Sequence, residues 1–303
     1  MTGSGPPGRA GEAATLDLAV TAGRVPTSER TVYEGEHGTL RPKVDRLAVE
    51  EPLEIRLTYP GGDSRRTAST LSVTMRTPGH DVELVAGFLL SEGIVSGTQD
   101  IRSVAYCLDR EIEPEQRYNV VTADLRRPPA REVHARNVVT SSACGVCGSA
   151  SIEAACGREH PAVAPGPLVA RSLLARLPGL LSSGQRGFAA TGGLHAAALV
   201  RSSGEVLALR EDVGRHNAVD KVVGWALLDG GLPAHDAVLV VSGRVSFEIV
   251  QKALQAGVSF VAAVSAATSL AARLAGETGM TLVGFVRGDR CTVYSGRERI
   301  LEG

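Results

Sequence analysis

The sequence predicts an α/β protein with a three-layer α/β/α sandwich as its core and a smaller α+β part before it. Two observations indicate this class. In the carboxyl-terminal half, continuous apolar runs at 237–241 and 259–264 flank a segment of helical periodicity at 247–256. Such strands are buried on both faces of a sheet that helices cover. In the amino-terminal half, apolar and polar residues alternate over 53–57 and 71–75, which predicts a hairpin.

Local signals predict the other elements of the amino-terminal half. Regular structure is expected to begin near Asp45. Thr77-Pro78 predicts a helix start, because threonine caps helices and proline suits the first helical position. One apolar face follows and Gly93 ends the helix; the face consists of Val82, Val85, Ala86, Leu89 and Leu90. Two further strands are expected at 104–106 and 118–122.

The carboxyl-terminal half contains a helix that Asn217 is expected to cap and Gly230 to end. The remaining expected elements are helices over 168–181 and 268–277, a hairpin of 195–200 and 205–209, and strands over 281–286 and 291–294.

Changes in composition divide the chain into four parts. Residues 1–40 are rich in glycine, proline, serine and threonine and are expected to form a flexible extension. Residues 41–140 form the smaller α+β part, and 168–303 form the α/β/α core. Between them, 141–167 is turn-rich and is expected to be a mobile loop and linker.

The composition excludes several classes of protein. Hydrophobic residues make up 43% of the 303 residues, charged residues 21%, and the net charge is −1. These values are typical of a globular protein and do not favour a nucleic-acid binder, which needs a basic surface. No apolar run approaches the length of a membrane span. No export signal is present and the five cysteines are odd in number, so we expect a cytoplasmic protein without nucleic-acid or membrane partners.

The segment Cys144-Gly145-Val146-Cys147-Gly148 indicates thiol chemistry. Its glycines leave the thiols open to a partner, and their backbone can curl around a thiolate, the reactive form. Four interpretations remain open: half of a zinc site, a dithiol redox switch, a thiol that carries sulfur, and a turn with incidental cysteines. A second pair of zinc ligands is missing from the sequence, and no strand-to-helix setting typical of redox CxxC motifs surrounds the segment.

Two segments that follow apolar strands are candidates for binding an anionic ligand. The first contains Ser242, Gly243 and Arg244, and lies between a strand and a helix. The second consists of Phe285, Val286, Arg287, Gly288, Asp289 and Arg290. In α/β sheets the carboxyl ends of strands form the usual ligand crevice, where backbone N–H groups and arginines bind phosphate. The polar cluster 211–217 and the glycines at 192–193 are open to either a structural or a ligand-binding role.

Together these motifs resemble the formate dehydrogenase accessory sulfurtransferases, over about Val44 to Arg299. The matching segments are AGFLLSEG at 86–93, CGVCG at 144–148, TGGLH at 191–195, REDVGRHN at 210–217, GRVSFE at 243–248 and GFVR at 284–287. Residues 1–40 lie outside the resemblance.

The resemblance implies a function. Such proteins take persulfide sulfur from a cysteine desulfurase on the CxxC loop. They deliver it to the molybdenum of the bis(molybdopterin guanine dinucleotide) cofactor, before that cofactor enters formate dehydrogenase. It also implies a fold similar to cytidine deaminases and a homodimer. The deaminases' zinc motifs are absent here as a set, so deaminase chemistry is not implied.

The resemblance also assigns residues. Cys144 corresponds to the persulfide-bearing cysteine, Cys147 to its partner, and 285–290 to the cofactor-binding stretch. The cofactor is carried as cargo, and no metal is held directly by the protein. The alternative is a zinc-stabilised chaperone of apo-formate dehydrogenase.

Overall fold

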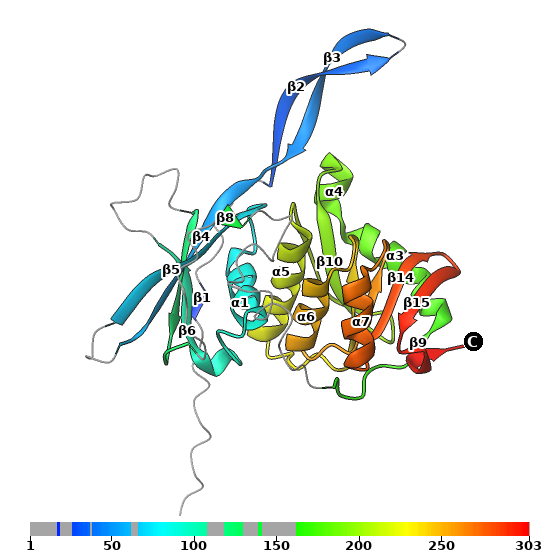
Figure 1. The fold of residues 1–303 in the computed structure, drawn as a ribbon. Coiled ribbons are helices and arrows are strands. Elements are labelled where there is room, and N and C mark those ends of the chain that lie inside the picture. Colours follow the sequence, from blue (N-terminus) through cyan, green and yellow to red (C-terminus); the bar gives the residue numbers. More distant parts are fainter. Residues whose placement is uncertain are drawn as a thin grey trace, which may run out of the picture.

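The structure is a computed structural model that contains two six-stranded sheets with helices packed between and beside them (Figure 1). It describes residues 17–18, 26–36, 38–61, 66–107, 118–129, 139–140 and 162–302. Cys144 and Cys147 therefore lie outside the described residues, as does nearly all of the predicted loop 141–167. The four predicted part boundaries stay predictions.

The first sheet contains the predicted hairpin. Its strand order is β1 (Asp17–Leu18), β6 (Ile101–Tyr106), β7 (Val120–Leu125), β4 (Glu51–Pro60), β5 (Arg66–Arg76) and β8 (Val139–Thr140). Strands β4 and β5 pair antiparallel, which confirms the hairpin that alternation predicts. The short strand β8 runs parallel to β5 at the edge of the sheet, with Thr140 beside Thr74.

The second sheet has four strands that end at the same edge. Its order is β11 (Val206–Asp212), β10 (His195–Arg201), β12 (Ala237–Val241), β13 (Phe260–Ala263), β14 (Thr281–Arg287) and β15 (Arg290–Ser295). Strands β12, β13 and β14 are parallel, and β10 is antiparallel to both of its neighbours. The carboxyl ends of β11, β12, β13 and β14 therefore meet at one edge, which we call the carboxyl edge.

Helices cover both faces of the second sheet, and the predicted α/β class is correct. One face packs against α5 (Arg215–Leu228), α6 (Phe247–Gln255) and α7 (Ser269–Glu277), the other against α3 (Arg171–Gly184). The apolar stripe of α3 consists of Leu173, Leu174, Leu177 and Leu181, all buried. The likeness of this unit to cytidine deaminases stays a prediction.

Helix α1 (Asp81–Ser91) connects the two sheets. Its buried face lies in one hydrophobic cluster with the first sheet and with α5. The helices cross at Gly87 and Gly224, where their backbones touch: a Cβ atom on Gly87 would overlap the carbonyl oxygen of Asp220, and one on Gly224 that of Glu83. Only glycine at both positions permits this close approach.

Several sequence predictions of element boundaries are wrong. The chain has regular structure well before Asp45, because β2 (Thr27–Glu36) and β3 (Thr39–Ala48) form a hairpin that projects from the body in Figure 1. Helix α1 starts at Asp81 rather than after Thr77, whose backbone N–H donates to Asp212 in the second sheet.

The expected helix cap at Asn217 is also wrong. Helix α5 starts at Arg215 after Gly214, and the Asn217 amide instead donates to the Met75 carbonyl and the Asp212 carboxylate. The periodic pattern missed the short helix α4 (Arg186–Thr191), the paired strands β9 (Val169–Ala170) and β16 (Ile300–Leu301), and the 3₁₀ turns Thr98–Asp100 and Arg297–Arg299.

Within the described part of the chain, no helix is both long and apolar enough to cross a membrane.

Gly224→Ala is expected to destabilise the protein by about 3 kcal/mol or more, because the added methyl group must push α1 away from α5. Urea unfolding of the purified variant measures the change. Gly276→Ala in α7 is the matched control, since nothing lies within 4 Å of its added Cβ atom. It should be neutral or stabilising by about 0.5–1 kcal/mol, the helix preference of alanine over glycine. Equal stability of the two variants would contradict the backbone contact.

Candidate functional site

Helices α5, α6 and α7 all begin at the carboxyl edge of the second sheet. Their cap residues are Gly214, Ser246 and Thr268, and each follows a strand by a short loop. Unpaired N–H groups at such helix starts carry partial positive charge. The edge therefore suits an anionic ligand before any side chain is considered.

Ser242, Gly243 and Arg244 lie at this edge, as the sequence predicts. The Ser242 backbone N–H donates to the Ala196 carbonyl at 3.0 Å, and its hydroxyl accepts from the Ala196 N–H at 2.9 Å. These two bonds tie the loop after β12 to β10. A Cβ atom on Gly243 would lie 3.4 Å from the His195 ring and from the Arg215 side chain, so the loop passes these two side chains at contact distance.

Cationic side chains gather around His195. Burial lowers the pKa of this imidazole, and the neighbouring charges of Arg215, His216 and Arg244 lower it further, against the opposing effect of Asp212. Two guanidinium groups and two imidazoles therefore lie close together at this edge. Such a cluster has the chemistry that favours phosphate-like groups.

The Glu248 carboxylate binds His216, another member of the cluster around His195. His216 Nε2 lies 2.8 Å from a Glu248 carboxylate oxygen and 3.1 Å from the Ser246 hydroxyl. Burial raises the pKa of Glu248, but the hydrogen bond and charge of His216 outweigh it, and the pKa lies below its usual range. The start of α6 is thereby held against α5.

The segment 285–290 contains the end of β14, the turn Gly288-Asp289 and the first residue of β15. Phe285 has a φ of 51°, rare for a residue with a side chain, and its ring is 43% exposed. Its N–H donates to the Ser265 carbonyl at 3.0 Å. Arg287 and Arg290 pair across the turn and are exposed, and Arg171 of α3 donates to the Asp289 carbonyl. The turn presents an aromatic ring and two guanidinium groups to solvent.

Not all of the predicted residues in this segment have exposed side chains. Val286 is buried in the cluster beneath α3, so only its backbone can contribute. The loop after β12 and the turn after β14 share the carboxyl edge with β13 between them, which separates them by two strand spacings, or about 10 Å. The sequence correctly brings the two segments to one edge.

Cys107 and Cys291, in the described part, are free and partly buried.

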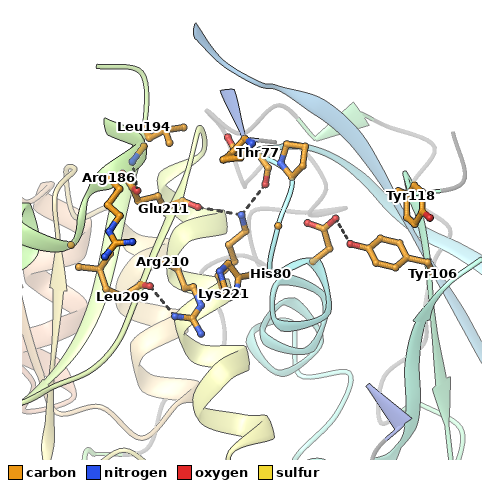
Figure 2. A pocket seen from close by; sticks show the side chains of 16 residues that line it. Thr77, His80, Tyr106, Tyr118, Arg186, Leu194, Leu209, Arg210, Glu211 and Lys221 are labelled. Atoms are coloured by element: carbon orange, nitrogen blue, oxygen red, sulfur yellow. Dashed lines mark hydrogen bonds between the residues drawn. The ribbon is translucent and has the colours of Figure 1, made fainter. Parts of the chain in front are cut away.

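A trough lies beside the end of β11, where the two sheets meet (Figure 2). Its volume is about 600 Å³. The loop before α1, the start of α4 and the end of β11 contribute most of its walls. Its lining includes Thr77, His80, Asp81, Tyr106, Tyr118, Arg186, Leu194, Leu209, Arg210, Glu211 and Lys221. Sequence reasoning missed this trough; only Leu194, Arg210 and Glu211 fall in motifs that it singled out.

The charges in the trough are held by specific partners. Lys221, 1% exposed, donates to the carbonyls of Thr77 and Glu211 at 2.9 and 3.2 Å and pairs with Asp212. The Glu211 carboxylate accepts two N–H groups at the start of α4. Arg210 binds Glu83 at 2.5 and 2.7 Å.

Asp81 also lines the trough. It accepts from the buried Arg76 and from the Tyr106 hydroxyl at 2.9 Å. No group of three or more metal-ligating side chains occurs among the residues described, a search that did not include Cys144 or Cys147.

Comparison with known proteins places the chain in a family. The model of the FdhD/NarQ family matches residues 48–301. The chain belongs to the FdhD/NarQ family. The sulfur carrier protein FdhD of Nocardia farcinica is 50% identical to this family member, over 92% of this chain and 96% of that protein. The sulfur carrier protein FdhD of Streptomyces coelicolor is 47% identical, over the same shares of the two chains.

A solved structure supports the fold of this FdhD/NarQ family member. It is that of a protein from Desulfotalea psychrophila described as a formate dehydrogenase accessory protein, with a TM-score of 0.69. The similarity covers 91% of this chain and 100% of that chain at 21% identity, so it bears on the fold alone.

His195→Asn is expected to flatten the pH dependence of stability in acid. The folded pKa of His195 lies below its ordinary value of 6.5. The unfolded chain therefore binds more protons below that pH, and the wild type loses stability as the pH falls. Urea unfolding between about pH 7 and pH 5 should show a smaller loss for the variant. A wild-type-minus-variant difference that does not change with pH would contradict the cationic environment of His195.

Proposed function

We propose that this protein is a sulfur carrier that accepts sulfur on Cys144 and delivers it to a molybdenum cofactor before that cofactor enters formate dehydrogenase. The single observation that carries the proposal is the CGVCG segment in a chain of the FdhD/NarQ family, whose curated relatives are named sulfur carrier proteins. The donor is a cysteine desulfurase with a persulfide. Its partners also include formate dehydrogenase and a second copy of the chain, and it acts in the cytoplasm, where thiols stay reduced.

The first step is thiolate exchange. The Cys144 thiolate attacks the outer sulfur of the desulfurase persulfide, a new S–S bond forms on Cys144, and the desulfurase cysteine leaves as a thiolate. Glycines on both sides of the motif leave the sulfur accessible to a large partner protein.

The second step releases the sulfur. The Cys147 thiol attacks the inner sulfur of the Cys144 persulfide, a disulfide forms between the two cysteines, and the outer sulfur leaves as sulfide. The two thiols supply the electrons for this release, and an external thiol must reduce the disulfide before the next cycle.

The carboxyl edge supports the cargo part of the proposal. The cargo is bis(molybdopterin guanine dinucleotide) with its molybdenum, written here as substrate. Phe285 offers an aromatic face for a guanine base, and Arg287 and Arg290 suit the guanine edge and phosphates. His195, Arg215 and Arg244 offer a second phosphate position on the same edge.

Chain length also supports it. Thr140 pairs with Thr74 on β5, and β8 runs toward the Thr77 end of that strand. Thr77 is three residues from Thr74, or about 10 Å along a strand. Cys144 is four residues from Thr140, and four residues span at most about 14 Å. The Cys144 sulfur can therefore reach the junction between β5 and β11, where the trough begins.

Cys144→Ser is expected to abolish persulfide formation. The purified protein is incubated with desulfurase and cysteine, and intact-mass spectrometry measures added sulfur. Cys291→Ser, which removes a thiol outside the motif, should load sulfur as the wild type does. Cys147→Ser should load but retain the sulfur. Sulfur loading and activation of formate dehydrogenase by Cys144→Ser would rule out the carrier role of Cys144, and one tightly bound zinc per chain would favour the chaperone alternative.

Arg287→Ala combined with Arg290→Ala is expected to weaken GDP binding at least about tenfold, because each lost charge-assisted hydrogen bond is worth about 1.5–3 kcal/mol. Calorimetry measures the affinity. Arg273→Ala on the exposed face of α7 removes an arginine that pairs only with its neighbour Glu277 and serves as the control. Unchanged GDP affinity in the double variant would contradict the assignment of 285–290.

A further inference from the structure

The trough has two chemically different ends. Figure 2 shows Arg186, Leu194, Leu209 and Arg210 at one end and Tyr106 and Tyr118 at the other, with Thr77, His80 and Lys221 between them. The first end is apolar with arginines, and the second is aromatic. A ligand that satisfies both ends has a flat ring and an anionic substituent.

The aromatic end is preorganised. The rings of Tyr106 and Tyr118 lie 5.4 Å apart and nearly perpendicular, at 80°. The Tyr106 hydroxyl donates to Asp81 at 2.9 Å, and Asp81 is itself held by Arg76. A pair fixed in this way offers a ring face and a ring edge to a planar ligand, with little side-chain entropy left to lose.

The apolar end of the trough contains an exposed cation, Arg186. Lys221 and Arg210 are each held by a carboxylate, Asp212 and Glu83 respectively. Arg186 differs, because no described carboxylate forms an ion pair with it. An exposed arginine at the rim, next to an apolar wall, is suited to a phosphate or carboxylate group on the ligand.

The trough continues the carboxyl edge. Leu194 lines it, and the next residue is His195 of the cation cluster. From Glu211 on β11 to Phe285 on β14, the edge crosses β10, β12 and β13, which is four strand spacings or about 19 Å. Phe285 lies at the β14 end of this line and the cations lie between β10 and β12, while Arg186 and the tyrosines line the trough beside the end of β11.

We propose that the trough is a second ligand site, which takes the pterin end of the cargo while the turn after β14 takes its guanine end. This inference rests on the proposed function, since it assumes the same cargo. A pterin is a planar fused ring with hydrogen-bonding edges, which suits the tyrosine pair. In this arrangement the protein would bind the base, the phosphates and the pterin ring in that order, which is the order in which a pterin guanine dinucleotide carries them.

The test uses pterin-6-carboxylate as the probe, because it carries the ring and an anion without a nucleotide. Its fluorescence polarisation is measured with the full-length protein, with and without saturating GDP. The wild type should bind the probe, and GDP should not displace it. Arg186→Gln and Tyr118→Leu should each weaken probe binding about tenfold and leave GDP affinity unchanged, because their contacts lie outside the nucleotide turn.

The controls separate this inference from the proposed function. Arg176→Gln on the exposed side of α3 changes an arginine outside the trough and should bind the probe as the wild type does. The Arg287/Arg290 double variant should lose GDP and keep the probe. Thermal unfolding checks that each variant is folded. Displacement of the probe by GDP, or wild-type probe affinity in both trough variants, overturns the pterin site. Failure of the wild type to bind GDP would instead count against the nucleotide site.

Discussion

The buried carboxylate of Asp212 joins the two sheets at the carboxyl edge, and the rest of the candidate site depends on it. It is fully buried and receives the Thr77 N–H, the Gly214 N–H and the Asn217 amide, and it pairs with Lys221. A buried charge with this many partners is stable, but it is costly to leave with any of them missing. It therefore fixes the loop before α1, the end of β11 and the start of α5 in one arrangement.

That arrangement gives the site its continuity. The trough, the cations around His195 and the turn after β14 come from segments far apart in the sequence, yet they follow one another along a single edge. The strand β8 brings the chain to the same region immediately before the cysteine motif. Only four residues of sequence separate Thr140 of β8 from Cys144.

The sequence could predict elements that have a strong apolar run or a clear helical period. The strand 237–241 is wholly apolar and 282–286 is nearly so, and the helices beside them are periodic, so their places were predictable. The hairpin 27–48 was missed because both of its faces are largely exposed and its alternation is interrupted by polar residues. Thr77 and Asn217 have the residue types of helix caps, but Asp212 and Met75 in other segments take their hydrogen bonds.

The site was predictable only where it follows strands directly. The segment 242–244 follows β12 and the segment 285–290 includes the end of β14, and the rule that strand ends form ligand crevices was enough to find both. The trough has no such signal, because eight separate stretches of chain line it and its tyrosines lie in β6 and just before β7, far from β11 in the sequence. Val286 was predicted as a binding residue, but its side chain is buried, because a sequence motif does not show which of its side chains turn inward.

The contact between Gly87 and Gly224 has a further consequence. Most helix pairs are separated by a layer of side chains that can repack, but here backbone meets backbone, so α1 and α5 have no room to slide. The interval between Tyr106 on β6 and Arg210 on β11 is therefore fixed by the main chain. If the two proposed sites bind one ligand, this fixed interval selects its length, since a mononucleotide would reach only one of them and a dinucleotide both.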